Sequence, residues 1–386
     1  MSIADGVENS IASARRYACE GFALFLKAKM NWTYKPLAQE NIDRFRRWLP
    51  ALGYTGKRCL PHGSYLINLG NPNNVKRAQA MDSFLDDLRR CALLGISVYN
   101  FHPGSGVGEC TKEQACTNIA TCINEAHLTL AKENLSCPII LLENMAGQGQ
   151  QVGRYFEELA DVIAQVRDKG KVGVCLDTAH AFAAGFDIHT IAGFNAMMAD
   201  FDRIIGAQYL HGMHLNDSKE ALGSRKDRHE NIGQGHIGLA PFWCIMNQER
   251  FAGMPLVLET PAASWRVWKG EIEALYELQG LPEEEGAWRG VKEKLKALSE
   301  LPKEMAGTDI AKAGLPPKPY KDQRTKGEGD KKGATGKTAQ AKVKKATAVK
   351  KEILRGQALQ HATDELAIDR PAADGGLAPK RKRKAL

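Results

Sequence analysis

Nine side chains with imidazole or carboxylate groups stand at or just after the ends of short apolar runs in the first two thirds of the chain. Imidazole nitrogens and carboxylate oxygens are ligands suited to zinc or manganese. At three or four ligands per ion, the set predicts more than one metal ion, and such clustered ions are typical of metal-dependent hydrolases. The predicted metal ligands are His62, His102, Glu143, Asp177, His180, His214, Asp227, His229 and Glu259.

The set is more informative than its members. A lone histidine after a strand is usually a hydrogen-bonded loop residue, and a lone glutamate there is usually a salt-bridge partner. Here, six of the seven apolar runs that we interpret as strands place an imidazole or a carboxylate at the same end. Asp227 and His229 add a pair two residues apart, and such side chains point the same way on an extended segment and can hold one ion. We therefore interpret the set as a metal centre.

The runs that position these ligands alternate with stretches of helical periodicity, such as 76–94, 112–133 and 153–169. Strands separated by helices indicate βαβ units and a parallel sheet, and seven such repeats favour an α/β fold of the (β/α)8 TIM-barrel type over an open sheet. Because a barrel gathers the carboxyl ends of its strands around one pocket, the ligands should converge. The predicted strands are 21–27, 58–62, 97–102, 139–143, 172–177, 209–214 and 256–259.

The composition of the chain changes near Pro302. Residues 303–386 hold 21 Lys and Arg against 10 Asp and Glu and have few large apolar side chains, whereas the rest holds 32 against 35. We therefore expect a catalytic barrel over residues 1–302 and a disordered basic tail over 303–386. We expect importin to read the last basic run as a nuclear localisation signal, with mitochondria as a second location of the protein. That run is Lys380, Arg381, Lys382, Arg383 and Lys384.

Other features of the composition narrow the class of protein. No run of 18 apolar residues occurs, so we expect no membrane span, and the N-terminal region lacks the apolar core of a secretory signal. Nine cysteines without a C-x-x-C pair predict reduced thiols in an intracellular compartment. Any metal ion should therefore be bound by histidine and carboxylate side chains.

Five longer motifs surround the predicted ligands. They are HGSYLINL from His62, NFHPGS from Asn100, DTAHAFAAG from Asp177, HLNDSK from His214 and GSRKDRHENIG from Gly223. These motifs resemble the endonuclease IV family of apurinic/apyrimidinic (AP) endonucleases, over about residues 2–273. The resemblance implies three zinc ions, with manganese as an alternative in one site. By this resemblance the ligands are His62, His102 and Glu143 for the first ion, Glu143, Asp177, His214 and Glu259 for the second, and His180, Asp227 and His229 for the third.

The resemblance also implies a substrate and a reaction. Members of this family act in base excision repair on double-stranded DNA: they hydrolyse the phosphodiester 5′ to an abasic site, leaving a 3′-hydroxyl and a 5′-deoxyribose phosphate, and they remove groups that block 3′ ends. Zinc lowers the pKa of bound water, which provides a hydroxide nucleophile near neutral pH. Glu143 would orient that hydroxide and is the predicted catalytic residue.

DNA contacts follow from the same resemblance. Tyr65 and Leu66 match positions that enter the duplex while the abasic sugar is flipped into the pocket. Met30 stands where the family commonly has an inserting arginine, so we expect Lys29 to replace only its charge, because lysine lacks the planar guanidinium. We expect the tail to add salt-dependent phosphate contacts.

The start of the chain differs from the family. The family opens with a strand of the type Gly-x-His-Val-Ser, whereas this chain opens Met-Ser-Ile-Ala-Asp-Gly. We therefore expect the first barrel strand to be absent, through a misassigned start or a short isoform. The segments 21–27 and 256–259 would then face each other as open edges.

Two other functions fit parts of the sequence. A metal-dependent sugar isomerase or epimerase would share the barrel, but such enzymes hold one or two ions, and the Asp227/His229 pair indicates a third. A non-catalytic chromatin-binding protein would use only the tail, and nine intact ligands argue against it. We expect a monomer.

Overall fold

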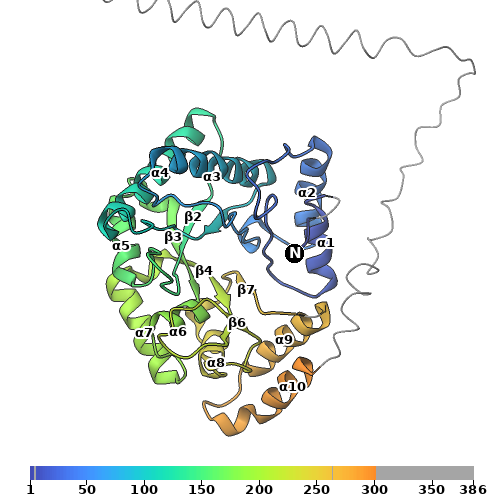
Figure 1. Cartoon of the computed structure of the whole chain (residues 1–386). Coiled ribbons are helices and arrows are strands. Elements are labelled where there is room, and N and C mark those ends of the chain that lie inside the picture. The colour runs from blue at the N-terminus through green and yellow to red at the C-terminus, as the bar shows by residue number, and fades with distance from the viewer. Residues whose placement is uncertain (4–5, 263, 301–386) are drawn as a thin grey trace, which may run out of the picture. The chain divides into compact units, whose positions relative to one another are not determined.

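The structure is a computed structural model that describes residues 1–3, 6–262 and 264–300 (Figure 1). Its main sheet has five parallel strands in the order β1-β2-β3-β4-β7, and a two-stranded antiparallel hairpin, β5 and β6, follows β4. The strands are β1 (Val98–Phe101), β2 (Ile139–Glu143), β3 (Val172–Asp177), β4 (Leu210–Leu215), β5 (Asp217–Ser218), β6 (His229–Glu230) and β7 (Leu256–Leu258). The predicted parallel sheet is confirmed.

Helices connect the strands and cover the outside of the curled sheet (Figure 1). This is the arrangement that parallel strands require, because each crossover must return to the same end of the sheet. The helices are α1 (Asn9–Arg16), α2 (Gln39–Ala51), α3 (Asn74–Leu94), α4 (Lys112–Lys132), α5 (Phe156–Gln165), α6 (Thr178–Ala184), α7 (Ile191–Ile204), α8 (Ala240–Asn247), α9 (Trp265–Leu278) and α10 (Arg289–Ser299).

Two predicted strands are wrong as regular elements. Segments 21–27 and 58–62 meet only through isolated parallel bridges, Phe22 with Cys59 and Phe25 with His62, and His62 bridges to Asn100 of β1. Backbone hydrogen bonds still join the two segments: Leu60 N donates to Phe22 O at 2.9 Å. On its other side the second segment faces β1, and there Pro61 accepts from Asn100 N but has no N–H to donate, which interrupts that ladder. The two segments therefore extend the curve of the sheet without forming strands.

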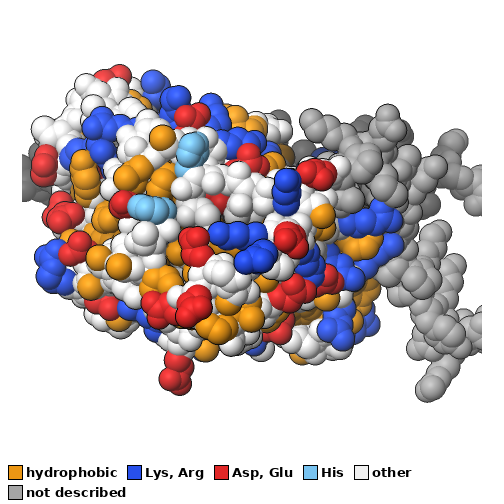
Figure 2. Space-filling model, turned by 90° about the horizontal axis from the view of Figure 1, so that it is seen from below, with side chains coloured by type: hydrophobic (Ala, Val, Ile, Leu, Met, Phe, Trp, Pro, Cys, Tyr) orange, Lys and Arg blue, Asp and Glu red, His pale blue; other side chains and the backbone are white. Residues whose placement is uncertain are grey.

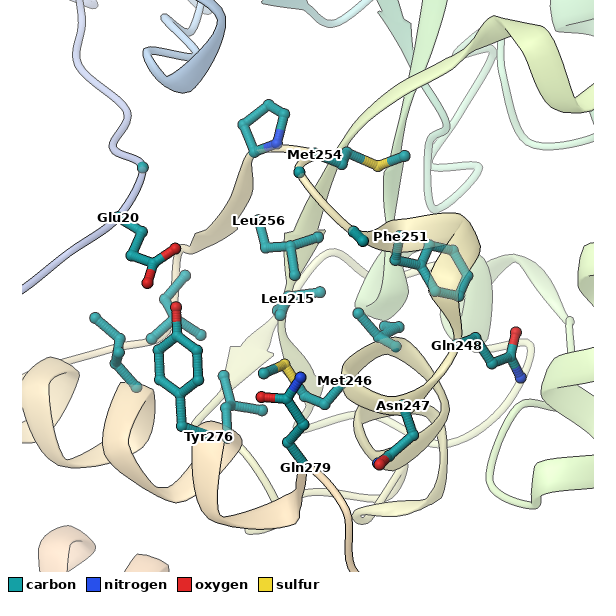
Figure 3. Close-up of a pocket in the computed structure, with 18 of the residues that line it drawn as sticks. Glu20, Leu215, Met246, Asn247, Gln248, Phe251, Met254, Leu256, Tyr276 and Gln279 are labelled. Carbon is teal, nitrogen blue, oxygen red and sulfur yellow. The ribbon is translucent and has the colours of Figure 1, made fainter. Parts of the chain in front are cut away.

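The two edges of the curved sheet are segment 21–27 and β7, and among the described residues they do not pair with each other. β7 pairs with β4 on one side, and a cavity of about 420 Å³ lies beside its other edge, between β7, α8, α9 and Gly21 (Figure 3). The N-terminal ammonium of Met1 donates to Ala23 O. Outside the sheet, Tyr17 stacks on Trp265 of α9 with ring centroids 5.4 Å apart. Tyr17 and Trp265 thus pack across the gap between segment 21–27 and β7.

The inside of the sheet is apolar, and the surface carries charged side chains. Inside the sheet, a small apolar cluster of Leu60, Val98, Leu141, Cys175 and Val257 fills the barrel. All nine cysteines are free. Among the described residues, no helix combines the length and apolar character needed to cross a membrane. Acidic and basic side chains are intermixed on the face seen in Figure 2.

Candidate metal centre

The predicted ligands lie at the carboxyl ends of the strands, as a barrel requires. Glu143 ends β2, Asp177 ends β3 and caps α6, and Glu259 directly follows β7. Three groups of ligand atoms form, and within each group all atoms lie within 4.8 Å of one another. The groups are His62, His102 and Glu143; Glu143, Asp177, His214 and Glu259; and Asp177, His180 and His229.

Glu143 lies at the centre of the cluster and is fully buried. Its Oε2 is 3.2 Å from His62 Nε2 and 3.6 Å from His102 Nε2. Its Oε1 is 3.2 Å from His214 Nδ1 and 3.3 Å from His180 Nδ1. Each oxygen of one carboxylate therefore faces a different pair of imidazoles, which is the geometry of a ligand shared by two ions.

Asp177 is shared in the same way. One oxygen accepts a hydrogen bond from His180 N at 2.8 Å, which caps α6. The other oxygen is 3.8 Å from both His214 Nδ1 and His229 Nε2. The second and third groups therefore have this carboxylate in common, which the sequence motif does not reveal.

Asp227 lies beside the third group. Its carboxylate oxygens are 3.3 Å from His180 Nε2 and 3.1 Å from His229 Nε2. Both ring nitrogens are buried and have no hydrogen-bond partner among the described residues. Buried polar atoms rarely stay unsatisfied, so imidazole nitrogens converging on a carboxylate without a hydrogen bond fit a cation between them. The residue types and the convergence both suit zinc.

Electrostatics of the cluster favour a bound cation. Burial alone would raise the pKa of Glu143, but the surrounding imidazoles, led by His214 and His102, hold it well below its usual range. For Glu259, burial is likewise outweighed by His214, and the pKa falls to about 2. Burial lowers the pKa of His102 to about 4. Despite burial, which acts in the opposite direction, acidic neighbours raise the pKa of His62, His180, His214 and His229. Cations bound between the carboxylates would displace those protons, because metal binding requires neutral imidazoles.

Three asparagines hold the ligands in place. Asn100 Nδ2 donates to Glu143 Oε2 at 2.6 Å. Asn144 pairs with the backbone of Asp177 through both atoms of its side-chain amide: Oδ1 accepts from Asp177 N at 2.6 Å, and Nδ2 donates to Asp177 O at 3.0 Å. Asn216 Nδ2 donates to Asp177 Oδ2 at 2.7 Å and its Oδ1 accepts from Glu259 N at 3.0 Å. Sequence reasoning missed these roles, although each asparagine stands within two residues of a predicted ligand.

The predicted DNA contacts lie together on the rim of this cluster. Tyr65 is 45% exposed, and its ring stacks on His102 with centroids 5.6 Å apart. Lys29 and Met30 are exposed on the adjacent segment, and Lys29 O accepts hydrogen bonds from Tyr65 N and Ser64 Oγ at 3.2 and 2.8 Å. Leu66 is half-buried. The structure thus presents apolar and cationic side chains next to the candidate metal centre.

A buried network on α3 anchors this rim segment. Lys27 Nζ donates to Ser83 O at 2.6 Å and lies 3.2 Å from Asp87 Oδ1. Arg90 donates to Leu26 O at 3.3 Å and to Lys35 O at 2.6 Å. Both ends of the segment that carries Lys29 are therefore fixed to one helix.

Comparison with known proteins decides the family. The model of the xylose isomerase-like TIM barrels matches residues 11–298. A probable endonuclease 4 from Campylobacter concisus is 42% identical over 279 residues, which cover 72% of this chain and 96% of that protein. The chain belongs to the endonuclease IV family. The predicted TIM-barrel class is thereby confirmed.

Further relatives of this endonuclease IV family member agree. The apurinic-apyrimidinic endonuclease 1 of Plasmodium berghei is 46% identical over 280 residues, 72% of this chain, but the match spans only about half of that protein, 54%. The crystal structure of endonuclease IV from Thermus thermophilus superposes with a TM-score of 0.60 at 29% identity, covering 78% of this chain and 97% of that one.

Proposed function

We propose that this chain is a zinc-dependent DNA repair endonuclease. It hydrolyses the phosphodiester 5′ to abasic sites in double-stranded DNA, leaves a 3′-hydroxyl and a 5′-deoxyribose phosphate, and removes groups that block 3′ ends. The observation that carries the proposal is the convergence of eight histidine and carboxylate ligands around a ninth, Glu143, in a chain whose relatives are named apurinic-apyrimidinic endonucleases.

The arrangement assigns distinct tasks to the residues. His62, His102, Glu143, Asp177 and the remaining ligands would hold three zinc ions. When bound, zinc supplies Lewis-acid chemistry: it neutralises the charge of a phosphodiester and makes water more acidic. Glu143 orients the attacking water, because Asn100 fixes one of its oxygens while the other faces His180 and His214.

The rim supports recognition of damaged DNA. Tyr65 and Leu66 enter the duplex beside the abasic site, and Lys29 approaches a backbone phosphate. Burial, reinforced by Glu259 and Glu143, raises the pKa of Tyr65 to about 12, so its hydroxyl remains neutral and can enter the base stack without carrying a charge. An exposed apolar wedge next to a cationic side chain suits a kinked duplex.

Incision of a duplex that carries one abasic site tests the proposal. We expect cleavage 5′ to the site, loss of cleavage after incubation with a chelator, and recovery on addition of zinc. Glu143→Gln should lower turnover by roughly 10³-fold or more, as single members of catalytic groups do, while DNA binding persists.

Glu133→Gln is the matched control, because Glu133 lies on the surface, where it pairs with Arg89. It should leave turnover unchanged. Full incision by metal-free protein, or wild-type turnover of Glu143→Gln, would contradict the mechanism. Epimerisation of a free sugar without incision would favour the alternative function.

We also propose that the protein is a nuclear monomer that importin carries through Lys380–Lys384. This run and the proposed tail lie outside the described residues.

A further inference from the structure

One carboxylate outside the ligand set is buried under the metal centre. Glu271 lies on α9 and is 1% exposed. It occupies the apolar face of that helix, together with Val267, Ala274 and Leu275. A carboxylate in such a position is costly unless it is hydrogen-bonded. Burial raises its pKa although its neighbours donate hydrogen bonds to it.

Three neutral donors point at this carboxylate. Oε1 accepts from Ile232 N at 2.9 Å and from Asn231 Nδ2 at 3.0 Å. Oε2 accepts from Thr260 Oγ1 at 2.6 Å. The three donor–acceptor distances are 3.0 Å or less, so the bonds hold their donors in place, and a neutral acceptor of the same shape can make them too.

The donors belong to two segments that each carry a predicted ligand. Thr260 directly follows Glu259, and Asn231 and Ile232 follow His229 within three residues. The segments also touch each other: Asn231 Nδ2 donates to Pro261 O at 2.8 Å, and His229 Nδ1 lies 3.4 Å from Glu259 O. Glu271 thus bonds to both the segment of the third ligand group and the segment of the second, in addition to their direct contacts.

We propose that Glu271 is a positioning residue that sets the separation between His229 and Glu259 and thereby tunes zinc affinity. The proposal rests on the zinc centre proposed above. Metal ligands must stay within about 0.2 Å of their preferred distances. Side chains that orient ligands without touching the ion typically change metal affinity by roughly 10–100-fold when they are lost.

Two substitutions at Glu271 separate hydrogen bonding from charge. Glu271→Gln keeps an oxygen for Asn231 and Ile232, and its amide can donate to the Thr260 hydroxyl, which rotates to accept. Glu271→Leu removes the shared acceptor: Ile232 N and the Thr260 hydroxyl lose it, and Asn231 Nδ2 keeps only Pro261 O. Glu277→Leu is the matched control, because Glu277 is on the same helix with its side chain 51% exposed.

The measurement is zinc binding in the absence of DNA, by competition between the full chain and a chromogenic chelator. For Glu271→Leu we expect one class of zinc to bind roughly 10–100-fold more weakly. Glu271→Gln and Glu277→Leu should bind like wild type. Incision by Glu271→Leu should recover when free zinc is raised.

Thr260→Val provides a second test if Glu271→Leu does not fold, since it removes only the hydroxyl donor. It should weaken the same class of zinc to a smaller extent. Wild-type zinc affinity in Thr260→Val, or in a folded Glu271→Leu, would overturn the positioning role alone. Equal weakening in Glu271→Gln and Glu271→Leu would show that the charge matters rather than the hydrogen bonds, and would also overturn it. Absence of zinc binding in the wild type would overturn this role together with the proposed function.

Discussion

Replacing Asp87 by asparagine should change how the stability of the protein depends on pH. The Asp87 carboxyl is buried on α3, where it faces Lys27 Nζ at 3.2 Å and accepts a hydrogen bond from the Tyr99 hydroxyl at 2.9 Å. Burial raises its pKa from 3.8 to about 6, although Lys27 and Tyr99 act in the opposite direction. The folded protein therefore keeps a proton on Asp87 over a range in which the unfolded chain has released it.

The sign and size follow from linkage. Since the folded-state pKa is the higher one, the stabilisation is complete below about pH 4 and is lost as the pH rises through 6. A shift of about two units corresponds to about 3 kcal/mol in total, and roughly 1–2 kcal/mol of it falls between pH 5 and 7.5. The asparagine does not titrate, so the free energy of unfolding of Asp87→Asn, relative to wild type, should increase by that amount over this range.

Urea unfolding at pH 5, 6 and 7.5, with zinc held constant, measures the difference. The metal ligands titrate in both proteins, so their contribution cancels on subtraction. Asp200→Asn is the control, because the Asp200 side chain is 51% exposed and pairs with Arg203. A free energy of unfolding of Asp87→Asn minus that of wild type that stays constant, or that falls with rising pH, would refute the reasoning.

Further outcomes are expected. Removal of residues 303–386 should leave incision intact while lowering DNA affinity and flattening its salt dependence, measured by titration; unchanged affinity would disprove this role of the tail. Deletion of 380–384 alone should abolish nuclear accumulation of a fluorescent fusion, and unchanged localisation would disprove the proposed signal. Asn216→Asp should reduce zinc content and lower the melting temperature, because a second carboxylate would face Asp177 at 2.7 Å; a fully loaded variant would count against this. An upstream extension of about ten residues encoding an apolar strand should raise both the melting temperature and the zinc content, whereas equal values would show that β7 needs no further partner.

Buried strands could be predicted well from the sequence. β2 and β3 match the predicted 139–143 and 172–177, because strands covered on both faces appear as continuous apolar runs. The predicted helix 153–169 is wrong at both ends. Gly153 has a φ of 104°, and a Cβ there would lie 3.0 Å from Glu143 O. At the other end, Asn124 bonds Gln165 O and Arg167 N and holds the chain extended.

The ligands could be predicted because the barrel topology alone brings strand ends together. Their sharing could not, since it depends on side-chain orientation: that Asp177 serves two groups follows from the α6 cap and from Asn216. Glu271 is a carboxylate on the apolar face of the amphipathic helix α9, but its partners lie 11 to 40 residues away in the chain.

The stacked pair Tyr17 and Trp265 has a consequence for how the chain folds. The two rings that pack across the gap between segment 21–27 and β7 are almost 250 residues apart in the sequence. During synthesis, α1 must therefore wait for nearly the whole barrel before it finds this partner. Contacts of such long sequence separation form late and slowly. Until they form, the apolar edges at Gly21 and β7 stay accessible, so the nascent protein should depend on chaperones at this last step of closure.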